Sequence, residues 1–275
     1  MHLVNGQPNA LIDIRDCGFQ YGDGLFETLS VLDGIPLYYS RHIARLKRGC
    51  QRLGILFTDF NALEQEVNSL CRESERAVIK IQITRGAGKT RGFKSAESVQ
   101  PTRVVSLSPY PNYPKFLASE GIQTRLCHTR LGINPALAGI KHSNRLEQII
   151  ARAEWGNAEI WEGILLDAEN FVVEGTMTNI FLATGNKLYT PAIDRCGVAG
   201  IMREIVIELA LRNNVDLVEG RITLGQLLDA DEFFLTNSIV EIWPVKQMGD
   251  RVYSIGPYAK RFIGWISECN ERQRL

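Results

Sequence analysis

The sequence has neither an excess of one charge nor a long apolar run. Its 31 lysines and arginines balance its 31 aspartates and glutamates, so no bulk charge draws it toward nucleic acid or a membrane surface. No stretch reaches the roughly 18 apolar residues of a membrane-spanning helix, and residues 1–6 lack the basic and apolar regions of a signal peptide. We therefore expect a protein without a nucleic-acid partner or a membrane partner.

Cysteine and histidine are scarce and scattered. None of the six cysteines forms a CxxC pair, and the four histidines form no HxxxH or HxH cluster. These spacings exclude the dense disulfide framework of small secreted proteins and give no pattern of metal ligands. The sequence therefore predicts reduced cysteines in a cytoplasmic protein that holds no metal.

The composition is that of a globular protein. With 275 residues, 45% hydrophobic and 23% charged, the chain can form one large domain or two of ordinary size. Strand-like runs occur at 3–6, 26–31, 78–84 and 103–107, and apolar residues recur at helical spacing over 43–53 and 60–70. These patterns predict a small α+β domain over residues 1–108.

Three prolines interrupt the chain within residues 109–114. Because proline does not fit inside a helix or a central strand, we place an interdomain linker at 109–117. Beyond it lie short strands at 122–127, 163–167, 171–174, 179–183 and 187–189, and helices at 144–156, 201–213 and 257–269. Strands spaced so closely predict a barrel-like or strongly curved sheet in a larger domain over 118–275.

Lys141 stands between a small apolar run, 136–140, and the start of a predicted helix. An amine tethered at a buried strand end is desolvated, which disfavours the ammonium form and yields a nucleophile toward an aldehyde such as that of pyridoxal phosphate. The alternative is a solvated lysine before a helix whose capping box is formed by Asn144 and Glu147. From this segment alone both interpretations stay open.

Pyridoxal phosphate also needs a carboxylate at its ring nitrogen and an anion site for its phosphate. Glu174 follows the apolar strand 171–173 and could supply the carboxylate, although an acidic residue at a hairpin turn is the plain alternative. Residues 197–203 carry glycines into the start of a helix, whose free amides attract anions. Asn237 and Ser238 follow another apolar strand and could add small donors, or could simply form a turn.

Two further strings complete a set of motifs. One is His42-x-x-Arg45-Leu46, and the other is Asp23-Gly24-x-Phe26-Glu27-Thr28. In their order along residues 3–247, the motifs resemble those of the fold-type IV pyridoxal phosphate enzymes. The resemblance implies a two-domain α+β fold, a cofactor lysine and a homodimer.

The same resemblance implies a role for several residues. Lys141 would bind the cofactor covalently, and Glu174 would face the pyridine nitrogen. The amides of Ile201 and Met202 and the Arg45 guanidinium would bind the phosphate, with Asn237 and Ser238 as further contacts. The solvated arginine remains the alternative for Arg45, since it flanks the apolar stripe of its helix.

Within this family, the string 141–148 and the basic, glycine-rich loop 84–93 resemble aminodeoxychorismate lyases. That resemblance implies cleavage of 4-amino-4-deoxychorismate to 4-aminobenzoate and pyruvate in folate synthesis. Arg85, Lys89 or Arg91 could pair with the substrate carboxylates, and a solvated loop is the alternative for each of them. Thr28, Asn144 and His142 are candidates to assist the proton transfers. The candidate substrate-binding residues are Thr28, Arg91 and Asn144. A D-amino-acid or branched-chain aminotransferase is the alternative activity, and a binding protein without chemistry is a third reading.

Overall fold

The computed structural model describes residues 1–8, 10–88, 92 and 99–273. The chain divides into two compact units, and neither is a single continuous stretch. The first contains residues 1–111, 140–144 and 272–275, and the second contains 112–139 and 145–271. Among the described residues, no helix is both long and apolar enough to cross a membrane.

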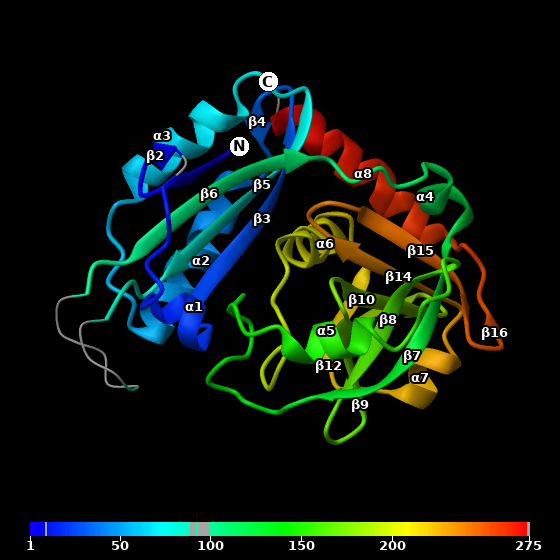
Figure 1. Cartoon of the computed structure of the whole chain (residues 1–275). Helices are drawn as coiled ribbons and strands as arrows, with labels where there is room; N and C mark the ends of the chain where they lie inside the picture. The colour runs from blue at the N-terminus through cyan, green and yellow to red at the C-terminus, as the bar shows by residue number, and fades with distance from the viewer. Residues whose placement is uncertain (9, 89–91, 93–98, 274–275) are drawn as a thin grey trace. The chain divides into compact units, whose positions relative to one another are not determined.

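The first unit is a six-stranded sheet with helices (Figure 1). Its strands run in the order β2-β1-β6-β5-β3-β4, and all neighbours are antiparallel. Its elements are β1 (His2–Val4), β2 (Gln7–Pro8), α1 (Cys17–Tyr21), β3 (Gly24–Leu32), β4 (Ile35–Pro36), α2 (Tyr39–Leu53), α3 (Phe60–Cys71), β5 (Arg76–Thr84) and β6 (Thr102–Pro109).

One face of this sheet is buried by α2 and α3 (Figure 1). The alternation in β5 explains why, since Ile79, Ile81 and Ile83 are fully buried while the residues between them are partly exposed. In α3, Leu63 and Val67 are also fully buried, one helical turn apart. The predicted strands and helices of this part of the chain are therefore present.

The second unit is built around a larger sheet (Figure 1). Its elements are α4 (Phe116–Glu120), β7 (Ile122–Leu131), α5 (Leu146–Arg152), β8 (Ile160–Asp167), β9 (Phe171–Gly175), β10 (Asn179–Thr184), β11 (Lys187–Pro191), α6 (Ile201–Arg212), β12 (Asp216–Gly220), β13 (Ile222–Thr223), α7 (Leu224–Leu228), β14 (Glu232–Asn237), β15 (Glu241–Met248), β16 (Arg251–Val252) and α8 (Pro257–Gln273).

Six strands of this sheet close into a ring. The path β10-β14-β15-β7-β8-β9 returns to its start because β9 also pairs with β10. A single apolar cluster takes residues from all six strands, among them Ile122, Ile164, Val172 and Trp243, so it fills the interior of the ring. The predicted α+β fold with a barrel-like sheet is confirmed.

The helix predicted at 144–156 is shorter in the structure. It covers only Leu146–Arg152, and its N-cap, Arg145, makes no side-chain capping bond. Asn144 instead donates to the carbonyl of Gly22, and Glu147 accepts from the amide of Gly132. The capping box of the alternative interpretation is therefore not formed, because each of its two side chains has a partner elsewhere.

Candidate cofactor site

Lys141 belongs by its contacts to the first unit, whereas the sequence placed it in the second domain. Its carbonyl accepts from the amide of Phe26 at 2.9 Å, and the amide of Ser143 donates to the carbonyl of Gly24 at 2.9 Å. These bonds, with the bridge between Leu25 and His142, attach the segment to the beginning of β3. The lysine backbone is therefore fixed by strand-like pairing.

The amine of Lys141 lies over an aromatic ring. Its Nζ is 4.4 Å from the centre of the Phe26 ring, and the Nζ of Lys80 is 5.3 Å from the same centre. Thr28, opposite Lys80 in the neighbouring strand, is partly buried on this sheet face. Lys141 and Thr28 thus lie in one unit, along with Asn144, which is exposed and bonded to Gly22.

The residues just before Lys141 are tied to the second unit. Gly139 donates to the carbonyl of Gly197 at 2.9 Å and accepts from the amide of Ala199 at 3.2 Å. Only one residue separates Gly139 from Lys141, so chain continuity keeps their Cα atoms within about 7 Å. The lysine is thereby tethered to the turn that precedes α6.

Glu174 is a buried carboxylate rather than an acid at an exposed turn. Its side chain is almost inaccessible to solvent, and Oε2 accepts from the amide of Val198 at 2.8 Å. Val198 lies in the same turn that binds Gly139. A carboxylate held in such a place can keep a pyridine nitrogen protonated, since burial strengthens its interaction with a nearby cation.

The amino end of α6 offers backbone donors. Its N-cap, Gly200, has no side chain to accept a bond from the amides of Ile201 and Met202. Gly197 has φ +82°, a conformation that favours glycine, and a Cβ there would lie 2.8 Å from Val173. A twelve-residue helix with uncapped amides and glycines before it is suited to bind a phosphate.

Asn237 lies beside the turn that follows Glu174. Its Nδ2 donates to the carbonyl of Met177 at 3.1 Å, and its Oδ1 accepts from the amides of Ile239 and Val240. The side chain therefore holds two turns together. Ser238 follows it and is partly buried, so the predicted Glu174, Asn237 and helix amides all belong to the second unit.

Arg45, expected at the phosphate, lies in the first unit and forms a buried ion pair. Its Nε and Nη2 donate to Glu27 at 2.8 and 2.5 Å, and the Nδ1 of His42 lies 2.7 Å from the same carboxylate. Burial alone would raise the pKa of Glu27, but Arg45 and His42 outweigh it and lower that pKa to about 2. Burial also lowers the pKa of His42.

The motifs predict no role for Glu27 or His42, although both residues stand inside them. The position of Glu27 in the apolar strand 24–32 does indicate a buried partner, because a buried carboxylate must be paired. The sequence does not identify that partner, which the fold brings from α2.

Arg85 does not offer its guanidinium to a ligand. All three nitrogens are engaged, with bonds to the Asp23 carboxylate and to the carbonyls of Leu53 and Gly54. Arg85 thus anchors the start of the basic loop. Arg91, the candidate for the substrate carboxylates, and Lys89 lie outside the described residues.

These donors fit pyridoxal phosphate. The first unit supplies an amine on Lys141, and the second supplies a buried carboxylate on Glu174, which accepts from the amide of Val198, and an uncapped helix end at α6. Arg45 adds a guanidinium in the first unit. No group of three or more metal-ligating side chains occurs among the described residues.

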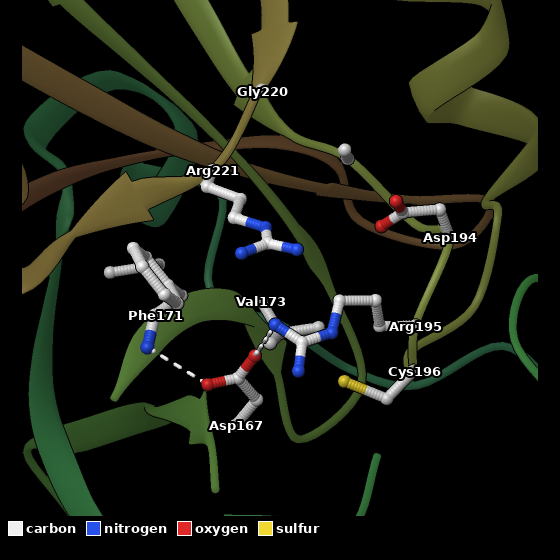
Figure 2. A pocket seen from close by; sticks show the side chains of 10 residues that line it. Asp167, Phe171, Val173, Asp194, Arg195, Cys196, Gly220 and Arg221 are labelled. Atoms are coloured by element: carbon white, nitrogen blue, oxygen red, sulfur yellow. Dashed lines mark hydrogen bonds and ion pairs between the residues drawn. The ribbon is translucent and has the colours of Figure 1, made fainter. Parts of the chain in front are cut away.

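A small pocket lies elsewhere in the second unit (Figure 2). Its guanidinium groups come from Arg195 and Arg221. Arg195 binds both oxygens of Glu169, and Arg221 lies over the Phe171 ring at 5.5 Å. Asp167 approaches Arg195 at 3.9 Å. The Arg195 guanidinium is therefore paired with carboxylates, and the pocket lacks the lysine amine and the helix amides of the candidate cofactor site.

The chain is similar over most of its length to known proteins. The family model for amino-transferase class IV matches residues 24–248. The crystal structure of 4-amino-4-deoxychorismate lyase from Pseudomonas aeruginosa is 41% identical, covers 98% of both chains and superposes with a TM-score of 0.94.

Two curated relatives carry different names. Aminodeoxychorismate lyase from Vibrio harveyi is 36% identical over 245 residues, which are 89% of this chain and 90% of the relative. A putative branched-chain-amino-acid aminotransferase from Methanocaldococcus jannaschii is 32% identical over 253 residues, which are 90% of this chain and 85% of the relative.

Proposed function

Because this chain belongs to the class IV aminotransferase family, we propose that it is a pyridoxal-phosphate-dependent lyase that cleaves 4-amino-4-deoxychorismate into 4-aminobenzoate and pyruvate. This is a step of folate synthesis. The string 141–148 supports the lyase over the aminotransferases. So does the similarity to the lyases of Pseudomonas aeruginosa and Vibrio harveyi, at 41% and 36% identity.

The observation that carries the proposal is the position of Lys141. Its backbone is paired with β3, its amine lies over Phe26, and two residues earlier the chain is bonded to the turn before α6. A merely solvated lysine would need none of these restraints. They support an amine held ready for a carbonyl group.

The candidate cofactor-binding residues match the chemical groups of pyridoxal phosphate. Bound pyridoxal phosphate supplies an aldehyde that combines with an amine, and a ring that accepts an electron pair when its nitrogen is protonated. Glu174 would keep that nitrogen protonated, and the amides of Ile201 and Met202, with Arg45, would bind the phosphate.

Lys141 also moves a proton. Its Nζ would act as the base that takes the proton from the substrate carbon bearing the nitrogen. The electron pair left on the ring would form the last ring double bond as the carbon–oxygen bond to the enolpyruvyl group breaks. The released enolpyruvate takes up one proton and tautomerises to pyruvate, and the ring that remains is aromatic. The gain of aromaticity drives the cleavage, so no keto-acid acceptor is required.

A product assay tests the proposal. Purified protein incubated with aminodeoxychorismate should release 4-aminobenzoate and pyruvate in equal amounts without any amino-acid or keto-acid cosubstrate, and Lys141→Ala should release neither. Efficient transamination of D-alanine or leucine, with no pyruvate from aminodeoxychorismate, would overturn the lyase activity and leave the fold and the cofactor standing.

The second candidate function is that of an aminotransferase. The 32% identity to a putative branched-chain aminotransferase favours it, and the same Lys141, Glu174 and phosphate donors would serve. Amino transfer that depends on 2-oxoglutarate would select this candidate. Activity in neither assay would leave a binding protein.

We also propose that the protein is a homodimer and acts in the cytoplasm. Helix α5 exposes Leu146, Ile149 and Ile150, and the segment before β3 exposes Leu11 and Phe19. Large apolar side chains exposed in this way favour contact with a second copy. All six cysteines are free thiols, as expected in a reducing compartment.

A further inference from the structure

The barrel of the second unit closes at one residue pair. Glu174, near the end of β9, pairs with Asn179 at the start of β10. The turn 175–178 joins them, and inside it the amide of Gly175 donates to the carbonyl of Thr178 at 2.7 Å. The carboxylate proposed to face the ring nitrogen is therefore one half of the closing pair.

A second carboxylate holds this turn. Glu162 is fully buried and accepts from the amides of Thr176 and Met177 at 3.0 and 3.1 Å. It also accepts from the hydroxyls of Thr176 and Thr178 at 2.5 and 3.0 Å. With no exposure to solvent, Glu162 can influence a ligand only through the turn that it holds.

The closing pair binds both backbone groups of Val198. Glu174 Oε2 accepts from its amide at 2.8 Å, and Asn179 Nδ2 donates to its carbonyl at 2.8 Å. Asn179 also packs against the N-cap of α6, because a Cβ on Gly200 would lie only 2.0 Å from Asn179 Oδ1. One amide side chain thus spans from the Glu174 strand to the amino end of α6.

We propose that Asn179 is a positioning residue that fixes the separation between the Glu174 carboxylate and the phosphate-binding end of α6. Glu162 supports it by holding the turn between Glu174 and Asn179. A pyridine ring and its phosphate are rigidly spaced, so the groups that bind them must be held at a matching distance. This inference rests on the proposed roles of Glu174 and α6, but not on the lyase reaction.

Asn179→Asp tests the proposal, because it keeps the size of the side chain and removes the donor to Val198. The matched control is Asn213→Asp, since Asn213 Nδ2 donates to the carbonyl of Leu209 at the other end of the same helix. Cofactor-free protein is titrated with pyridoxal phosphate by fluorescence, and the unfolding midpoint of each variant is measured separately.

Asn179→Asp should weaken pyridoxal phosphate binding by about tenfold, the loss expected for one hydrogen bond. Asn213→Asp should leave that affinity within about twofold, although its new charge at a helix carboxyl end lowers the unfolding midpoint. If Asn179→Asp binds the cofactor like the wild type, or if both variants lose affinity in proportion to their stability, Asn179 does not position the site.

Gly200→Ala keeps the test decisive should Asn179→Asp fail to fold. Gly200 has φ −67° and ψ 143°, which alanine adopts readily, so the added methyl group disturbs only its contacts, with Asn179 foremost. Gly200→Ala should weaken cofactor binding when it is the only substitution. In an Asn179→Ala background it should lower the cofactor affinity further by less than about twofold. Equal losses in both backgrounds would contradict the proposal.

Glu174→Gln separates this inference from the assignment on which it rests. That variant should still bind the cofactor but lower turnover by about a hundredfold or more. If Glu174→Gln keeps full activity, the ring-nitrogen assignment fails and the inference fails with it. If Glu174→Gln behaves as expected while both Asn179 and Gly200 variants bind normally, only the inference is overturned.

Discussion

Two lysines, Lys80 and Lys141, contact the same ring, that of Phe26, but their backbones are bonded to different elements. Lys80 lies within β5, whereas Lys141 lies on a short segment bonded to β3 at one end and, through Gly139, to the turn before α6 at the other. The Nζ atoms of both lysines lie over the Phe26 ring. Only Lys141 is tethered to the element that supplies the phosphate donors, so we assign the covalent role to it.

Replacing Lys141 by alanine should abolish covalent attachment of the cofactor. Purified wild-type protein should be yellow, and borohydride reduction followed by proteolysis should label the peptide that holds Lys141. Lys141→Ala should lack the visible absorbance unless free pyridoxal phosphate is added, because no amine is left at that position.

Lys80→Ala is the matched control, since its Nζ contacts the same ring. It should keep the absorbance and the labelled peptide. Borohydride labelling of the Lys80 peptide, or of any other, would show that the cofactor lysine is misassigned.

The buried cluster of Glu27, His42 and Arg45 makes stability depend on pH. The pKa of Glu27 is lowered to about 2 in the folded protein, against about 4.3 in an unfolded chain. Its contribution is therefore present above about pH 4.3 and is lost as the pH falls toward 2. Burial lowers the pKa of His42, so below about pH 6.5 the unfolded chain gains a proton that the folded state resists.

Urea unfolding between pH 7 and pH 3 should show this loss. The free energy of unfolding should fall with decreasing pH, by on the order of 2 kcal/mol from Glu27 at pH 3. Glu27→Gln should be less stable at pH 7 by about 3–5 kcal/mol, because Arg45 is left buried without its counter-charge. A Glu27→Gln variant as stable as the wild type, with an unchanged pH dependence, would contradict this account.

Helix α8 begins at a carboxylate that comes from another element. Glu232, at the start of β14, accepts from the amide of Tyr258 at 2.7 Å, and a Cβ on Gly256 would lie 2.1 Å from its Oε2. The start of α8 therefore depends on a side chain of β14. The Glu232 carboxylate thus accepts from the first backbone amides of the helix, which have no partner within the helix and which a local N-cap side chain would otherwise bind.

Glu232→Ala should lower the free energy of unfolding by about 0.5–2 kcal/mol, the usual effect of losing an N-cap acceptor. Thermal unfolding followed by circular dichroism measures it. Glu208→Ala on α6 is the control, because its ion pair with Arg212 is at the surface and is worth less than about 1 kcal/mol. Equal losses in the two variants would remove Glu232 as the cap of α8.

Some elements could be predicted from the sequence, and others depend on distant partners. Helix α6 follows from its local pattern, since glycines precede an apolar stripe and the helix starts at the expected residue, Ile201. The start of α5 does not, because Asn144 and Glu147 bind backbone groups far along the chain. Local rules can name a capping candidate, but they cannot show which distant group competes for it.

The same limit applies to the site. Lys141, Glu174 and the α6 amides stand in recognisable strings, so the sequence could propose them. The ion pair of Arg45 with Glu27 and the bond of Asn179 to Val198 join residues 18 and 19 positions apart. Such pairs become visible only when the fold brings their elements together.

At the scale of the whole molecule, exposed apolar residues predict the assembly. On α5, the exposed Leu146, Ile149 and Ile150 recur at helical spacing, which places them on adjoining positions of the helix. A monomer would leave these groups in water. A second copy of the chain is the partner that the proposed homodimer supplies.

Analytical ultracentrifugation should therefore find twice the mass of one chain. Ile149→Lys should shift the protein toward monomers, because a charge would be buried in the contact. Leu211→Lys, at an exposed position on α6, should leave the dimer intact. A wild-type monomer that is fully active at micromolar concentration would overturn the prediction.

The division of the chain into two discontinuous units also bears on how the protein is made. Residues 1–111 leave the ribosome first, but the stretch 140–144, which pairs with Gly24 and Phe26 in β3, follows only after β7 has been synthesised. During translation the edge of β3 at residues 24–26 therefore stays unpaired until residues 140–144 have been synthesised. A fragment cut at Pro111 would keep the open edge permanently, as a template for aggregation rather than an independent domain.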